Sequence, residues 1–142
     1  MRATGEFAVS LQPLEPFANG SAGIRLDRLS ITKTFHGDLV AESLGEMLSV
    51  TTNAEDSAGY VAVEQVEGAL QGKTGTFVLQ HFGIIRRGEQ QLILEVVPDS
   101  GTGQLENLSG KMSIKIENGK HFYEFEYSTD DVDFGESYST NI

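Results

Sequence analysis

Three residue pairs in this sequence have the composition of tight two-residue hairpin turns: Gly72-Lys73, Arg87-Gly88 and Asn118-Gly119. Such turns need positive φ at their central residues, which glycine and asparagine tolerate best, so Asn-Gly is the strongest of the three signals. Each pair is flanked by runs in which apolar and polar residues alternate, as in half-buried strands. The sequence therefore predicts antiparallel hairpins whose register is set by their turns.

Alternating runs of this type recur along the chain, and no segment shows a sustained helical period. Short connections and 16 glycines favour a sheet that closes on itself. We expect an all-β fold, an eight-stranded antiparallel up-and-down closed barrel, as one domain over residues 1–128. At most one helical turn is expected, near residues 104–108. The predicted strands cover residues 3–12, 24–36, 39–52, 58–71, 74–86, 90–98, 110–117 and 120–128.

The inward face of residues 39–52 is left open by the periodicity, because apolar residues occur in both phases. A two-residue loop after Phe35 turns Glu42 and Glu46 toward the face of Ile31. A bulged three-residue loop turns Ala41, Ser43 and Met47 there instead. We favour the bulged loop, since it avoids burying two carboxylates.

A carboxylate and an imidazole are predicted to meet inside the barrel. The turn at Gly72-Lys73 places Glu64 directly opposite His81, and the turn at Arg87-Gly88 places His81 beside Leu94 on the apolar face. A histidine held by a carboxylate can move protons near neutral pH, which makes Glu64 and His81 candidate catalytic residues. The alternative is that the two buried side chains only hydrogen-bond to each other and have no role beyond the fold. The residues predicted to share this face and to bind a ligand are Tyr60, Glu64, His81, His121, Tyr123 and Tyr127.

The opposite face of the central strands is unusually apolar for a solvated surface. In the same register Val61 and Val63 pair with Ile84 and Phe82, and Ile93 follows on the next strand. A row of this kind usually marks an interface. We expect a homo-oligomer, most simply a two-fold dimer, that buries Val61, Val63, Phe82, Ile84 and Ile93.

Composition narrows the classes of function. The chain has no cysteine, so disulfides and thiolate chemistry are excluded, and no apolar run is long enough for a signal peptide or a membrane span. We expect a cytoplasmic protein. A net charge of −11 argues against nucleic acid and anionic membranes as partners. No metal site or cofactor is expected, because the histidines lack ligand spacing and Gly101-x-Gly103 lacks the third glycine of a nucleotide-binding loop.

Residues 129–142 form a separate acidic tail, which holds four of the 21 acidic residues and no lysine or arginine. As an alternative to a dimer interface, its apolar residues Val132, Phe134 and Tyr138 are expected to cover the apolar outer face.

Several stretches of the chain resemble a bacterial family of functionally uncharacterised domains, over most of residues 1–128. They are Phe35–Leu39, Gly59–Ala62, Glu64–Val66, Phe77–His81 and Val97–Gly103. That family is similar to the allene oxide cyclase barrels and their dirigent relatives, and Gly101-Thr102-Gly103 resembles a turn of those barrels. The resemblance implies an allene oxide cyclase-like barrel. No motif assigns the catalytic residues of those enzymes to positions in this sequence.

Three functions follow, in order of preference. The first is a barrel that binds a small apolar molecule, with the interior glutamate, histidine and tyrosine cluster fixing its orientation. The second is an enzyme of isomerase, cyclase or lyase type that uses Glu64 and His81 as an acid-base pair. The third is an oligomeric interaction module with an inert interior. The residues alone leave open whether the protein is an enzyme.

Overall fold

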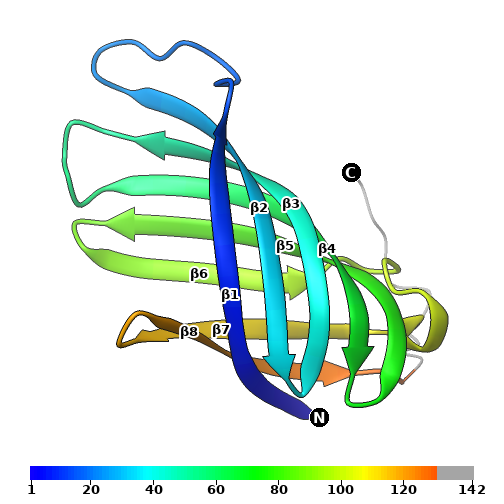
Figure 1. Ribbon diagram of the computed structural model, residues 1–142. Helices are drawn as coiled ribbons and strands as arrows, with labels where there is room; N and C mark the ends of the chain where they lie inside the picture. Colours follow the sequence, from blue (N-terminus) through cyan, green and yellow to red (C-terminus); the bar gives the residue numbers. More distant parts are fainter. Residues whose placement is uncertain (131–142) are drawn as a thin grey trace, which may run out of the picture.

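The eight predicted strands are present and form a closed antiparallel barrel in the order β1 to β8, in a computed structural model that describes residues 1–130 (Figure 1). The predicted acidic tail therefore lies almost wholly outside the described residues, and so do Val132, Phe134 and Tyr138. One 3-10 turn, η1 (Gly103–Leu105), is the predicted helical turn. The strands are β1 (Arg2–Leu14), β2 (Arg25–Gly37), β3 (Leu39–Thr51), β4 (Ala58–Leu70), β5 (Lys73–Arg86), β6 (Glu89–Val96), β7 (Ser109–Glu117) and β8 (Lys120–Ser128). Within residues 1–130, no helix has the length and apolar character needed to cross a membrane.

The three predicted hairpins exist, but the first turn is one residue earlier than expected. Its central residues are Gln71 and Gly72, with φ of 46° and 87°, so Leu70 pairs with Lys73. The other two turns, at Arg87-Gly88 and Asn118-Gly119, also have glycine second and positive φ at both positions. Glycine is thus used at the same turn position in all three hairpins. The prediction placed glycine first, at Gly72-Lys73, whereas the structure has Gln71 and Gly72 both at positive φ, as in a turn with glycine second.

This displacement moves the β4–β5 register by two residues and does not itself move a side chain to the other face. A two-residue shift preserves the alternation of a strand, whereas a one-residue slip would reverse it. Val61 therefore pairs with Phe82, and Val63 pairs with Gln80. The β5–β6 and β7–β8 registers are as predicted, with His81 opposite Leu94 and Met112 opposite Phe125.

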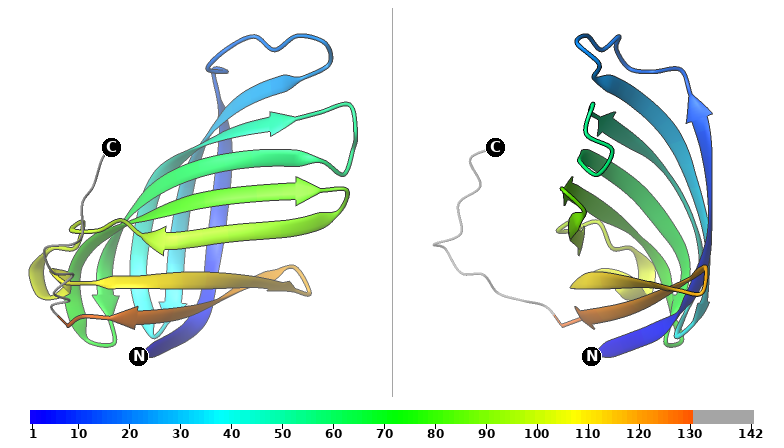
Figure 2. Two further views of the ribbon diagram at one scale, coloured as in Figure 1. Left: turned by 180° about the vertical axis from the view of Figure 1, so that it is seen from behind. Right: turned by 90° about the vertical axis from the view of Figure 1, so that its left-hand side faces the viewer.

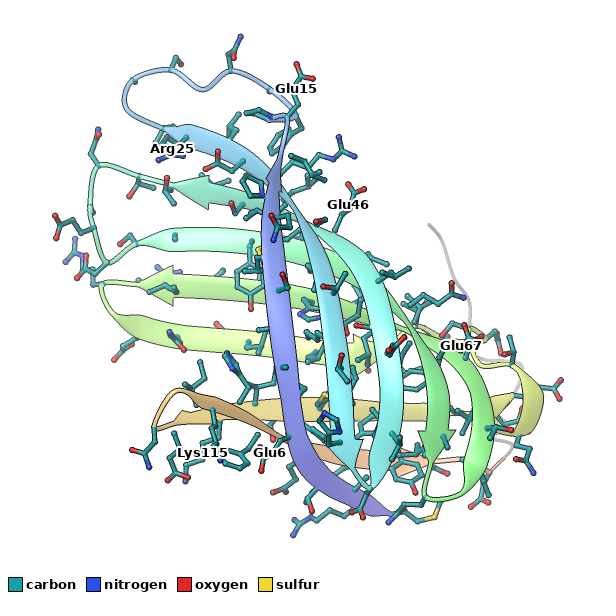
Figure 3. The ribbon with its side chains drawn as sticks, viewed as in Figure 1. Glu6, Glu15, Arg25, Glu46, Glu67 and Lys115 are labelled. Atoms are coloured by element: carbon teal, nitrogen blue, oxygen red, sulfur yellow. The ribbon has the colours of Figure 1, made fainter. Side chains whose placement is uncertain are left out.

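The inward face of β3 is the one predicted from a bulged loop. Phe35 pairs with Ala41, and Ala41 and Ser43 are buried. Glu42 and Glu46 are exposed, so neither carboxylate enters the core. Figure 3 shows Glu46 of β3 and Glu67 of β4 projecting from the outside of the barrel. The cost of removing two carboxylates from water therefore explains why the face of β3 that carries Ala41 and Ser43 points inward.

The barrel interior is packed at one end. A cluster of buried aromatic and aliphatic side chains fills the end near the β4–β5 turn and η1, and it includes Phe35, Phe77, Phe125, Leu79 and Leu105. The Phe77 and Phe125 rings stack with centroids 6.1 Å apart, and Leu105 of η1 is fully buried. The 3-10 turn therefore closes this end of the barrel, which lies opposite the loops that join β1 to β2 and β3 to β4 (Figure 1).

The ladders that close the barrel lie mainly at the packed end. Strand β8 pairs with β1 only from Arg2 to Phe7, although β1 continues to Leu14. Strands β6 and β7 share one pair in the described residues, Glu95 with Lys111. The β7–β8 hairpin accordingly separates from its neighbours toward its turn (Figure 2). The other end of the barrel is therefore the one that can admit a molecule.

The apolar outer face predicted for the central strands is present on β3 to β6. Val61, Val63, Phe82 and Ile93 are each 43–53% exposed. Ile84 differs, because it is half-buried and lines the interior cavity near the open end. Phe82 lies beside a groove of about 450 Å³ that is also lined by Leu48, Val61 and Val63. In the two-fold dimer expected from the sequence, this groove and Phe82 would both lie at the interface.

We predict that Phe82→Asp converts a homodimer into a monomer, because it places a carboxylate among Val61, Val63 and Leu48 and close to the carboxylate of Glu46. Light scattering of the two proteins at equal concentration measures the change. A wild-type protein that is monomeric at all accessible concentrations contradicts the predicted interface.

Candidate functional site

Glu64 lies in the middle of β4 with its carboxylate fully buried and hydrogen-bonded to three other strands. His81 Nε2 of β5 lies 2.5 Å from Oε2, and the Lys33 ammonium of β2 donates to the same oxygen at 2.8 Å. The Ser43 hydroxyl of β3 donates to Oε1 at 2.9 Å. No buried side-chain nitrogen or oxygen in residues 1–130 lacks a partner. The Glu64 carboxylate is therefore fully paired within the buried cluster of Lys33, Ser43, Glu64 and His81.

Glu64 and His81 are not directly opposed, contrary to the prediction. Glu64 pairs with Leu79, and His81 pairs with Ala62, because of the earlier β4–β5 turn. The two side chains are diagonal neighbours on the same face, within reach of long side chains. Their contact survives the error in register because both remain inward.

Lys33 was missed by the sequence analysis, although the sequence contains a signal for it. It occupies the phase of Ile31 and Phe35, which are both buried, and its own side chain is 5% exposed. Lysine is almost never buried without a partner. Its ammonium also lies 4.8 Å from the centroid of the Phe7 ring, a cation–π distance. A lysine in an apolar phase thus pointed to a buried carboxylate, and Glu64 is that carboxylate.

Glu64 is held in its charged form. Burial raises the pKa of Glu64, but the hydrogen bond from His81 and the charge of Lys33 outweigh burial, so the pKa lies below the usual glutamate value. An ionised carboxylate is only an acceptor, so His81 Nε2 must carry the proton. In neutral His81, Nδ1 is then unprotonated, and no group in residues 1–130 bonds to it. Because Nδ1 is also not enclosed, its lone pair is available to a bound molecule.

A cavity of about 710 Å³ extends from this cluster to the open end of the barrel. Lys33 and His81 lie at its base, and Tyr60 and His121 line its walls. The Tyr60 ring lies against Gly83 of β5, where a Cβ would approach the ring to 2.2 Å. Burial raises the pKa of the Tyr60 hydroxyl, which has no hydrogen-bond partner in the described chain. The other lining residues are Phe7, Val9, Leu11, Ile31, Met47, Ile84, Ile85, Gln90, Gln91, Leu92, Ser113, Ile114 and Ile116.

Tyr123 and Tyr127 do not reach this cavity, although both have the predicted inward phase. The Tyr123 hydroxyl donates to His36 O at 2.8 Å and accepts from Leu39 N at 2.8 Å, which ties β8 to the β2–β3 loop. The Tyr127 hydroxyl bonds to the side chain of Gln71 at the β4–β5 turn. Both tyrosines thus serve the packed end of the barrel. Of the six residues predicted to bind a ligand, Tyr60, His81 and His121 line the cavity and Glu64 lies beneath it. Tyr123 and Tyr127 lie elsewhere.

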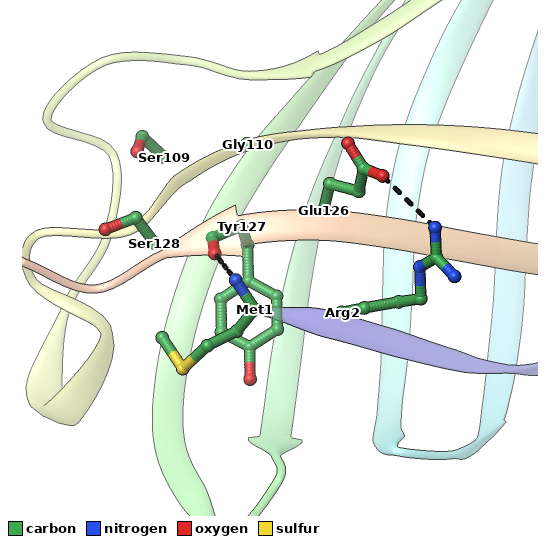
Figure 4. A pocket seen from close by; sticks show the side chains of 7 residues that line it. All are labelled: Met1, Arg2, Ser109, Gly110, Glu126, Tyr127 and Ser128. Carbon is green, nitrogen blue, oxygen red and sulfur yellow. Dashed lines mark hydrogen bonds and ion pairs between the residues drawn. The ribbon is translucent and has the colours of Figure 1, made fainter.

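A second, shallow pocket at the packed end belongs to the closure of the barrel (Figure 4). The amino group of Met1 donates to Tyr127 O at 2.8 Å, and Arg2 pairs with Glu126 at 3.4 Å. These contacts join β1 to β8. In the part of the chain that the structure describes, no three histidine or acidic side chains gather as they would around a metal ion.

Substitution of Glu64 and substitution of Lys33 are expected to lower the stability of the protein by different amounts. We predict that Glu64→Leu destabilises the protein by about 3–5 kcal/mol, because it leaves the Lys33 ammonium buried without a counter-charge. The milder Glu64→Gln also leaves that charge uncompensated. Lys33→Met should cost less, since Glu64 keeps His81 and Ser43.

The double variant Lys33→Met/Glu64→Leu is expected to be more stable than Glu64→Leu, with a coupling energy of roughly 2–3 kcal/mol, because no buried charge remains. Denaturant unfolding of the four proteins measures this cycle. Lys115→Met is the matched control, because Lys115 is 72% exposed. Simple addition of the two single costs would mean that the ion pair is not formed.

Comparisons with known proteins agree with this barrel. The model of a family described as "Protein of unknown function (DUF3224)" matches residues 3–127. A crystal structure of a protein with unknown function from that family, from Shewanella oneidensis MR-1, shares 53% sequence identity and superposes with a TM-score of 0.87. The match covers 90% of this chain and 96% of the other. No curated protein matches the chain. The chain therefore belongs to the DUF3224 family of uncharacterised proteins.

Proposed function

We propose that the protein binds one small, largely apolar molecule inside the barrel, with the polar part of that molecule directed toward His81. Most of the cavity lining is aliphatic or aromatic, which suits an apolar ligand body. Lys33 and His81 lie together beside Glu64 at the base of the cavity, which suits a ligand whose polar end is directed there. The cytoplasm remains the expected location.

The observation that carries this proposal is the combination of an open cavity with unpartnered polar atoms at its base. His81 Nδ1 and the Tyr60 hydroxyl have no partner in residues 1–130 and are not enclosed. A purely structural polar cluster would be expected to use all its hydrogen-bonding atoms internally. The open cavity also favours ligand binding over an inert interior.

Proton transfer is the second candidate function, and the orientation of His81 favours it. Glu64 accepts a hydrogen bond from Nε2, which fixes the tautomer and leaves Nδ1 as the basic atom of a side chain that lines the cavity. An imidazole held in this way can remove a proton from a bound molecule and return it at another atom. This arrangement supports an isomerase, cyclase or lyase. The resemblance to allene oxide cyclase barrels, expected from the sequence, is part of this second proposal.

A cavity-filling substitution tests ligand binding. We predict that Leu92→Trp abolishes the fluorescence increase of the neutral apolar probe N-phenyl-1-naphthylamine on addition of protein, because Leu92 lines the cavity. Ile93→Trp is the matched control. It lies next in sequence on the opposite face of β6, with 44% exposure against 37% for Leu92.

Equal loss of probe signal in Leu92→Trp and Ile93→Trp would contradict an interior site, and so would the absence of signal in the wild type. Circular dichroism of both variants verifies that the barrel is intact.

A further inference from the structure

The cavity differs in charge from the rest of the protein. The chain has 21 acidic and 10 basic residues, yet the cavity lining contains Lys33, His81 and His121 and no aspartate or glutamate. Acidic residues instead occupy outward positions such as Glu42, Glu46 and Glu67. A lining without carboxylates in so acidic a chain favours a negatively charged ligand over a cationic one.

Glu64 does not reverse this preference. Its carboxylate is 0% exposed, and both oxygens already accept hydrogen bonds from Lys33, Ser43 and His81. It therefore offers no acceptor to a ligand. The groups that can reach a ligand are mostly donors. They include the Tyr60 hydroxyl and the Lys33 ammonium, which has three N–H groups and one hydrogen bond in the described chain.

The charge balance of the cluster implies that the protein takes up a proton when an anion binds in the cavity. Lys33 and Glu64 cancel each other, so the buried cluster is neutral when His81 is neutral. A buried anion needs an uncompensated positive charge beside it. The titratable groups that contact His81 or line the same cavity are Glu64 and Tyr60 of β4, Lys33 of β2 and His121 of β8. Among these, His81 is the one titratable imidazole that both contacts the Glu64 carboxylate and lines the cavity.

We propose that the ligand is an apolar monocarboxylate, and that His81 takes up one proton when the carboxylate binds beside Lys33 and Tyr60. This inference rests on the proposed binding function and adds the chemical class of the ligand. A carboxylate fits better than a phosphate, because the cavity lining contains no arginine for bidentate contacts with a doubly charged group.

Calorimetric titration with octanoate and with 1-octanol, which share an apolar chain and differ in charge, tests the proposal. We expect octanoate to bind more tightly at about pH 6 than at about pH 8, by roughly tenfold or more, because one proton is bound with it. Repeating the titration in buffers of different ionisation enthalpy should show uptake of about one proton. 1-Octanol should bind without proton uptake and with equal affinity at both pH values.

His81→Gln identifies the group that takes up the proton. The glutamine amide can still donate to Glu64 but does not titrate, so octanoate should bind this variant without proton uptake and without the gain at low pH. His36→Gln is the matched control, because His36 is exposed and lies outside the cavity lining. It should leave the titration unchanged.

The outcomes separate this inference from the proposed function. Binding of 1-octanol without binding of octanoate would overturn the monocarboxylate and leave an apolar-ligand site. Octanoate binding without proton uptake, or uptake that persists in His81→Gln, would overturn the role of His81. Failure of both probes to bind would overturn the proposed function together with this inference.

Discussion

The Glu64 carboxylate is the constraint around which the interior is organised. An isolated carboxylate in this position would be strongly unfavourable, so its burial requires donors of fixed position. Strands β2, β3 and β5 each supply one, through Lys33, Ser43 and His81. The cluster thereby joins four adjacent strands at mid-barrel. It also lies between the packed end and the cavity, because Lys33 and His81 line the cavity whereas Phe35 and Leu79, two residues away on the same strands, belong to the core.

The two ends of the barrel are built for different purposes. At the packed end, η1, the stacked aromatic rings and the Tyr123 hydroxyl bonds complete the core, and the β1–β8 ladder closes the sheet. At the other end the β7–β8 hairpin is joined to its neighbours only near its base. Stability is therefore concentrated where no ligand can enter, and the loosely paired end can admit a molecule without loss of the core.

The sequence predicted the faces of the strands better than positions along them. Alternation assigned His81, Tyr60 and Tyr123 to the interior, and the structure agrees. Alternation does not say how far along the barrel axis a residue lies, which is why Tyr123 and Tyr127 were expected at the cavity. The one-residue error at the Gln71-Gly72 turn changed the partner of Glu64 and left its face unchanged. Lys33 was overlooked because its partner lies 31 residues away, on a strand that β2 does not adjoin.

The most direct test of this account is the tautomer of His81, measured by ¹⁵N NMR of histidine-labelled protein, with His81→Gln used to assign the signal. The account predicts that, at neutral pH and without ligand, Nε2 is protonated and Nδ1 is not, because the ionised Glu64 accepts the Nε2 proton. A spectrum with the proton on Nδ1 and a bare Nε2 would contradict it, since the imidazole would then not donate to Glu64 and would present no base to the cavity.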